Sequence, residues 1–191
     1  MARRQTLAGH PPCHNSGMRV SAKADYALRA AAELASAEPG ERVKRDLIAV
    51  RQGIPVEFLE SVLLSLKHAG IVQSQRGASG GFRLARPPSQ ISLADVIRAV
   101  DGPMADVRGD RPETIEYPGP ARHLRDIWIA LRASLRGILE GTSLEDLVDG
   151  RLSREVRRLT RDPEAWVSMG RVRGTTKFKT AHRGRRGVSP R

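Results

Sequence analysis

Two short helical patterns separated by a tight corner lie within residues 44–70. The first covers residues 44–52 and stops at Gly53, a residue suited to the left-handed turn that ends many helices. The second begins near Phe58, and Pro55 suits its first turn, where the backbone N–H groups have no partner within the helix. The apolar positions expected to face inward are Leu47 and Ile48 in the first helix and Leu59, Val62, Leu63, Leu66 and Ala69 in the second. Two opposed helices joined in this way predict a helix-turn-helix.

A β-hairpin is predicted directly after this pair. Residues 71–75 and 82–85 have the composition of strands, and the Gly-rich segment 76–81 between them suits a loose turn. A hairpin in this place would form the wing of a winged helix-turn-helix.

Helices are also predicted on both sides of this unit. An Ala-rich helix over residues 24–37 is expected before it, with Ser21 as its cap. After it, Ser92 and Asp95 have the spacing of a capping box and open a short helix that runs to Val100.

A long amphipathic helix is predicted from Ala121 to Leu139, after a loop over residues 101–119 that is rich in Gly, Pro and charge. A helix of about 20 residues is roughly 30 Å long, which exceeds what a small winged domain needs for its own core. Its apolar stripe therefore favours pairing with a second copy over internal packing. The expected dimer-interface residues are Leu124, Ile127, Trp128, Leu131, Leu135 and Ile138. Thr142 and Glu145 are expected to cap a following helix, and residues 152–166 to form another.

Together these elements predict a mainly α protein with a small β-hairpin, built as a winged helix-turn-helix plus a long dimerisation helix. Residues 18–101 form the expected DNA-binding domain, residues 102–119 the loop, and residues 120–169 the dimerisation helix and C-terminal helices. Residues 1–17 are expected to be a disordered extension, with Met18 the better start, and residues 170–191 a basic disordered tail.

The net charge of +12 is concentrated outside this compact region. Residues 1–17 and 171–191 contain basic residues and no acidic ones, which leaves 23 basic against 21 acidic residues in between. A basic tail attracts polyanions generally and does not specify a site. No stretch approaches the roughly 18 apolar residues of a membrane span, and the single cysteine, Cys13, allows no intrachain disulfide. A cytoplasmic protein without a membrane partner is expected.

Several motifs in the correct order resemble the Rrf2 (Rrf-two) family of winged helix-turn-helix transcription regulators, which includes IscR, NsrR and CymR. The matching segments are Met18-Arg19-Val20-Ser21-Ala22-Lys23, Gln52-Gly53-Ile54-Pro55, Leu66-Lys67-x-x-Gly70-Ile71-Val72, Arg76-Gly77-x-x-Gly80-Gly81-Phe82 and Val96-Ile97-x-Ala99-Val100-Asp101-Gly102. The resemblance covers roughly residues 18–150. It implies a homodimer that binds partly palindromic operators in double-stranded DNA, usually to repress transcription.

The resemblance also implies which residues contact DNA. The second helix of the motif would present its first side chains to the major groove, where Glu57 can accept from a cytosine amino group and Phe58 can touch a thymine methyl. The wing would place a guanidinium in the minor groove, and the start of the first helix would contact phosphates. The expected DNA-binding residues are Arg19, Ser21, Lys23, Tyr26, Pro55, Val56, Glu57, Phe58, Ser61, Arg76 and Gly77.

One departure from the family concerns iron. Relatives that carry a cluster have three cysteines in the loop before the long helix, whereas residues 101–122 contain none here. An iron–sulfur cluster needs thiolate ligands, so this chain is expected to lack a cluster and any other cofactor. Its effector, if it has one, would then be a small molecule or a protein partner.

Three other functions compare with DNA binding as interpretations of this sequence. A protein-interaction module that docks a metabolic enzyme, with DNA binding secondary, is the main alternative, and an RNA- or ribosome-associated protein is suggested only by the basic tail. An enzyme is not expected because the sequence contains no nucleophile–base pair, carboxylate dyad or metal constellation. His10, Cys13 and His14 are better explained as part of an unstructured extension than as a metal site.

Overall fold

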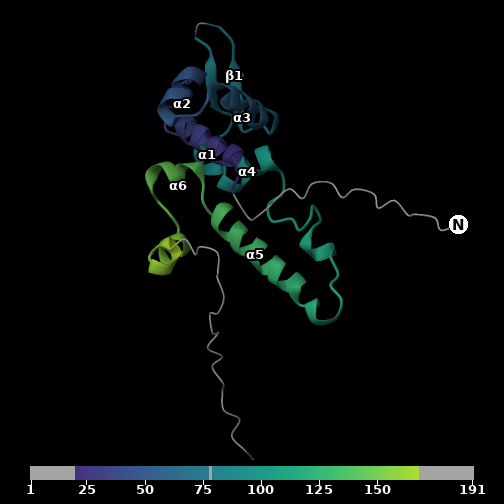
Figure 1. Cartoon of the computed structure of the whole chain (residues 1–191). Coiled ribbons are helices and arrows are strands. Elements are labelled where there is room, and N and C mark those ends of the chain that lie inside the picture. The colour runs from purple at the N-terminus through teal and green to yellow at the C-terminus, as the bar shows by residue number, and fades with distance from the viewer. Residues whose placement is uncertain (1–19, 78, 168–191) are drawn as a thin grey trace, which may run out of the picture.

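The structure is a computed structural model that describes residues 20–77 and 79–167. Its main elements are α1 (Ala22–Ala35), α2 (Arg45–Gln52), α3 (Val56–His68), β1 (Val72–Gln75), β2 (Gly81–Leu84), α4 (Leu93–Asp101), α5 (Leu124–Leu139), α6 (Leu144–Asp149) and α7 (Arg154–Thr160). Helices α1 to α4 and the antiparallel hairpin gather at one end, and α5 leads away from them (Figure 1). The prediction of a mainly helical fold with one small hairpin is confirmed. The predicted extension over residues 1–17 and tail over residues 170–191 lie outside the described residues.

Helix α1 lies at the centre of the winged unit (Figure 1). The Ser21 hydroxyl accepts a hydrogen bond from the Ala24 N–H at 2.9 Å, so Ser21 caps the helix as predicted. The inner face of α1 is built from alanines at positions 24, 27, 30 and 31, each at most 1% exposed. Because these side chains are small, α3 and α4 can pack closely against the α1 backbone.

A buried carboxylate joins α1 to α2. Glu33 is only 9% exposed and accepts hydrogen bonds from Arg51 Nη1 at 2.7 Å and Gln52 Nε2 at 2.8 Å. Burial raises the pKa of Glu33, but these two hydrogen bonds and the charge of Arg51 outweigh burial and lower it below its ordinary value. Glu33 is therefore ionised in the folded protein at neutral pH and holds the C-terminal end of α2, at the corner of the helix-turn-helix, against α1.

The chain returns from α5 to the winged unit through a short backbone pairing. The Leu93 N–H donates to the Thr142 carbonyl at 3.0 Å, and the Leu144 N–H donates to the Ile91 carbonyl at 2.9 Å. Leu144 is fully buried in the core that α1, α3 and α4 share. The C-terminal end of α5 is thus attached firmly to the winged unit.

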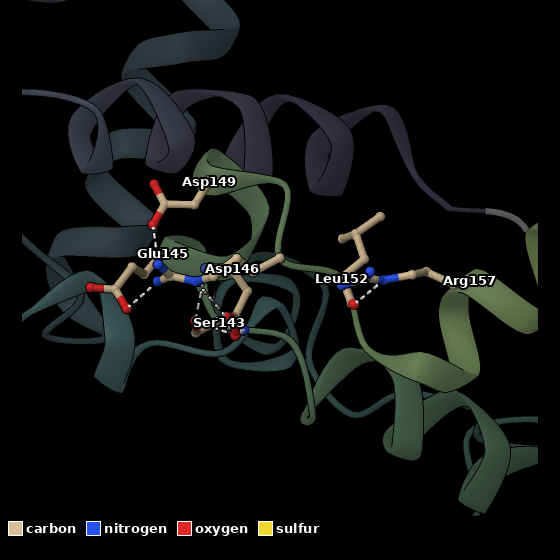
Figure 2. A network of polar contacts seen from close by, with 7 residues as sticks. Ser143, Glu145, Asp146, Asp149, Leu152 and Arg157 are labelled. Carbon is tan, nitrogen blue, oxygen red and sulfur yellow. Dashed lines mark hydrogen bonds and ion pairs between the residues drawn. The ribbon is translucent and has the colours of Figure 1, made fainter.

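The capping box of α6 lies one residue later than predicted. Ser143, rather than Thr142, is the cap, and it exchanges hydrogen bonds with Asp146 rather than with Glu145 (Figure 2). The Thr142 hydroxyl instead donates to the Ile138 carbonyl, and Glu145 pairs with Arg151 at 2.8 Å. The backbone pairing of residues 142–144 with residues 91–93 determines which residue caps α6. The spacing of residues within the segment does not predict this pairing.

Other boundaries also differ from the predictions. Helix α5 begins at Leu124 rather than Ala121, because the Pro-rich residues before it form a 3₁₀ turn over Gly119–Ala121. Its 16 residues span about 24 Å. Leu47 and Ala69, both expected to face inward, are exposed, Leu47 by 41%. Each strand begins and ends within one residue of its predicted bounds. Among the described residues, no helix is both long and apolar enough to cross a membrane.

Replacing Glu33 by Gln should lower the free energy of unfolding at pH 7 by about 1–3 kcal/mol, because Arg51 loses its carboxylate partner. The lowered pKa of Glu33 means that its stabilisation is complete above the ordinary value of 4.5 and disappears as the pH falls through the folded value. The difference between Glu33→Gln and the wild type should therefore shrink at acid pH. Urea denaturation at pH 7 and near pH 3 measures both values.

Glu155→Gln, at an exposed position on α7, serves as the control and should change stability by less than about 0.5 kcal/mol. An equal difference at the two pH values would contradict the role given to Glu33.

Candidate nucleic-acid interface

Helix α3 presents one buried and one exposed face at the helix-turn-helix corner. Gly53 ends α2 in the left-handed conformation with φ 59°, and Ile54 is buried beneath the corner. Pro55 is the N-cap of α3 rather than part of its first turn, and the helix begins at Val56. The buried face carries Leu59, Val62, Leu63 and Leu66. The predicted groove-reading residues Pro55, Val56, Glu57, Phe58 and Ser61 are all exposed.

These exposed side chains give the first turn of α3 a mixed chemistry. Glu57 lies in this turn, where the helix dipole favours a negative charge. In a DNA groove a carboxylate is repelled by the phosphates, so Glu57 is favourable there only when it accepts from a base amino group such as that of cytosine. Phe58 is 58% exposed and offers an apolar edge to a thymine methyl.

An aromatic contact from α1 supports the start of α3. The rings of Tyr26 and Phe58 lie 6.1 Å apart between centroids, at 57° to one another. The Arg29 guanidinium lies 5.8 Å from the Tyr26 centroid, within the range of a cation–π contact. Tyr26, predicted to contact phosphate, is thus also a support for Phe58. Sequence reasoning missed Arg29, although its spacing of three residues from Tyr26 places both on one helix face.

An exposed ion pair joins α2 to α3. Arg45 pairs with Glu60 of α3 and, at 2.9 Å, with Asp46. A hydrogen bond with Asp46, followed by the charges of both carboxylates, raises the pKa of Arg45. Exposed pairs contribute little stability, so this contact serves mainly to orient the two helices.

The wing is closed by two glycines that leave no room for a side chain. A Cβ on Gly80 would lie 2.4 Å from the Gln75 carbonyl oxygen, and one on Gly81 would lie 2.8 Å from the Val43 carbonyl oxygen. Phe82 and Val43 also exchange two backbone hydrogen bonds of 2.9 Å, so the wing is anchored to the segment before α2. Nothing in the local sequence predicts that the segment around Val43 pairs with the hairpin.

The predicted wing residues lie at the tip of the hairpin. Arg76 and Gly77 are both exposed, and Gly77 has φ 105°, a conformation that favours glycine. The hairpin therefore presents a guanidinium at its tip on a rigid base.

The predicted phosphate contacts on α1 have different surroundings. The Ser21 hydroxyl caps α1 and also donates to Asp101 Oδ2 at 2.6 Å, so it already makes two hydrogen bonds within the chain. Lys23 is half-buried. Arg19 lies outside the described residues. The DNA contacts of all three stay predictions.

The loop before α5 does not have the donor set of an iron–sulfur site. The side chains that line the space between this loop, α4 and α5 include four arginines, Glu113 and Asp106. Guanidinium groups cannot bind iron, and the only cysteine of the chain is Cys13. Among the described residues, no group of three or more His, Cys, Asp or Glu side chains is placed to hold a metal ion.

Helix α5 has an apolar face that its own chain covers incompletely. None of its residues is buried, and Ile127 is 58% exposed. The other predicted interface residues are half-buried, namely Leu124, Trp128, Leu131, Leu135 and Ile138. This face is available to a further partner.

Comparisons with known proteins agree on one family. The model of the Rrf2 family, described as an iron-dependent transcriptional regulator, matches residues 20–150. A Mycobacterium tuberculosis protein named as an HTH-type transcriptional regulator is 48% identical over 151 residues, which cover 79% of this chain and 94% of the relative. The HTH-type transcriptional regulator CymR of Bacillus subtilis is 35% identical over 130 residues, which cover 68% of this chain and 89% of CymR.

Solved structures give the same result. The structure of CymR, described as the global cysteine regulator of B. subtilis, has a TM-score of 0.60 at 32% identity and covers 70% of this chain and 98% of its own. The structure of IscR from T. potens has a TM-score of 0.58 at 28% identity and covers 81% of this chain and 95% of its own.

Replacing Gly81 by Ala should loosen the wing, because the new Cβ would meet the Val43 carbonyl and push the two segments apart. We expect a loss of about 1–3 kcal/mol in unfolding free energy. The matched control is Gly137→Ala in α5, where the nearest atom to a Cβ is the flexible Glu155 carboxylate at 4.0 Å. Ala is favoured over Gly in a helix interior, so this variant should gain about 0.5–1 kcal/mol. Thermal and urea unfolding of both variants measure the difference, and an unchanged stability of Gly81→Ala would contradict the anchored wing.

Proposed function

The chain belongs to the Rrf2 family of DNA-binding transcriptional regulators, and on this basis we propose that it represses transcription as a homodimer bound to a partly palindromic operator. No iron–sulfur cluster takes part in this activity, because the loop that holds one in relatives offers arginines in place of thiolates.

The observation that carries the proposal is the exposed first turn of α3 beside an anchored wing. Glu57, Phe58 and Ser61 project from a helix whose opposite face is buried, which is the arrangement of a recognition helix in the major groove. Arg76 at the hairpin tip suits a narrow A·T-rich minor groove, where the negative potential is strongest. Phosphate contacts from the start of α1 would position the protein without reading sequence.

The incompletely covered face of α5 supports a homodimer. Six apolar side chains on one helix form a continuous stripe with no buried member, and such a stripe commonly pairs with its own copy. A two-fold dimer would carry two recognition helices, which reach half-sites about 34–36 Å apart, one turn of DNA. The palindrome of the operator would then mirror the symmetry of the protein.

The operator can be found by selecting fragments of the host genome that bind the purified protein. We expect a shared, partly palindromic motif upstream of genes. No preference for any promoter fragment over random duplex at moderate salt would overturn the proposed function.

Replacing Arg76 by Ala should weaken binding to the selected operator by about tenfold, with the largest loss at operators whose wing-facing segment is A·T-rich. Arg158→Ala, at an exposed position on α7, is the control and should leave affinity unchanged. Fluorescence anisotropy with operators that differ only in this segment measures the effect. An equal loss on every sequence would mean that Arg76 contacts phosphate alone.

Replacing both Leu131 and Leu135 by Asp should produce monomers, because four charges would enter the shared apolar stripe. Operator affinity should fall by about 100-fold or more, since each half-site would bind separately. Ile127→Asp is a second variant whose exposed side chain endangers the fold less, and Ala133→Asp on the exposed side of α5 is the control. Sedimentation velocity measures the oligomeric state. A dimer that persists in both variants would place the interface elsewhere.

A further inference from the structure

A cavity of about 410 Å³ lies between the end of α4, the following loop and α5. Its volume is within the range of about 300–1,000 Å³ that small-molecule sites occupy. Four arginines from three different segments line it: Arg98 from α4, Arg111 from the loop, and Arg132 and Arg136 from α5. Two carboxylates, Asp106 and Glu113, also line it.

The arginines have more donor capacity than the nearby carboxylates use. Arg132, whose side chain is only 15% exposed, pairs with Glu113 at 2.6 Å. Arg98 and Arg136 share one carboxylate, that of Glu140, which pairs with Arg98 and lies 3.7 Å from Arg136 Nε.

Among the residues that line the cavity, the four arginines outnumber the two carboxylates, Asp106 and Glu113. Asp95 lies 3.8 Å from Arg98. A backbone hydrogen bond and the hydrogen bond from Arg132 lower the pKa of Glu113, and the charge of Arg111 adds to this effect. Each guanidinium carries five N–H donors, so the four arginines have donors for a bound anion beyond those that the nearby carboxylates engage.

The loop that forms one wall has an unusual backbone. Ala105 and Arg108 have φ values of 60° and 57°, although neither is glycine. The segment is held in this shape by a pair of backbone hydrogen bonds between Val107 and Asp110, of 2.9 and 3.0 Å. Strained residues of this kind persist where the surrounding structure holds them, and they are frequent at ligand sites.

We propose that this cavity binds a small multivalent anion, a metabolite with several carboxylate or phosphate groups, and that the anion regulates binding to the operator. The proposal rests on the proposed function for its regulatory part. Guanidinium groups recognise carboxylate and phosphate oxygens through paired, charge-assisted hydrogen bonds. Arginines on opposite walls suit a ligand with at least two anionic groups.

A continuous set of contacts joins the cavity to the recognition helix. Arg98 lies one helical turn before Asp101, whose carboxylate accepts the 2.6 Å hydrogen bond from Ser21 at the start of α1. Tyr26 of α1 in turn packs against Phe58 of α3. An anion that competes with Glu140 for Arg98 would act on α4 and, through α1, on the first turn of α3.

The test uses the full-length protein and two probes, citrate and inorganic pyrophosphate, at constant ionic strength set with sodium chloride. Isothermal titration calorimetry should show saturable binding of at least one probe, with one site per chain. Arg111→Gln should weaken this binding by about tenfold or more, since the ligand loses a charge-assisted pair of hydrogen bonds. Arg158→Gln, away from the cavity on α7, should bind like the wild type. Thermal unfolding checks that both variants are folded.

The second part of the test measures operator affinity with and without the probe that binds. The probe should change the affinity of the wild type at least threefold and leave that of Arg111→Gln unchanged, whereas without the probe both should bind equally well. Binding of neither probe, or binding that Arg111→Gln does not weaken, would overturn the anion site. Anion binding with no change in operator affinity would overturn its regulatory role. A protein that binds the anion and no operator would contradict the proposed function alone, since calorimetry judges the cavity without DNA.

Discussion

The contact between the alanine face of α1 and the helices around it is the constraint on which the other arrangements depend. Ala24, Ala27, Ala30 and Ala31 are almost fully buried, and α1 packs against α3, α4 and α6. A larger side chain at any of these positions would push a neighbouring helix outward, because close-packed cores absorb added volume poorly. The position of Tyr26 beside Phe58, and the hydrogen bond from Ser21 to Asp101, both follow from this close approach.

Features that depend on local chemistry could be predicted from the sequence. Gly53, Pro55 and the apolar spacing after them determine the helix-turn-helix, and the glycines at 80 and 81 mark the wing. Contacts between distant segments could not be predicted in this way. The pairing of Val43 with Phe82, the contact of Tyr26 with Phe58 and the register at residues 142–144 join residues whose neighbours in sequence carry no sign of the contact.

The loop before α5 shows how one position in a fold can carry different chemistry. Thiolates there would favour iron, whereas arginines favour oxyanions. In either case the loop lies between α4, which contacts the core, and α5, whose apolar face is incompletely covered. A ligand bound at this loop would therefore lie close both to the winged unit and to the surface proposed for dimerisation.

The attachment of the hairpin to Val43 has an evolutionary consequence. The backbone hydrogen bonds from Val43 hold the hairpin at Phe82, next to the turn, so the exposed tip residues Arg76 and Gly77 beyond them contribute little to the core. Substitutions or short insertions at the tip can accumulate without loss of folding. After gene duplication, two copies can therefore diverge in their minor-groove preference while the residues of α3 stay the same, and new operators can be acquired one groove at a time.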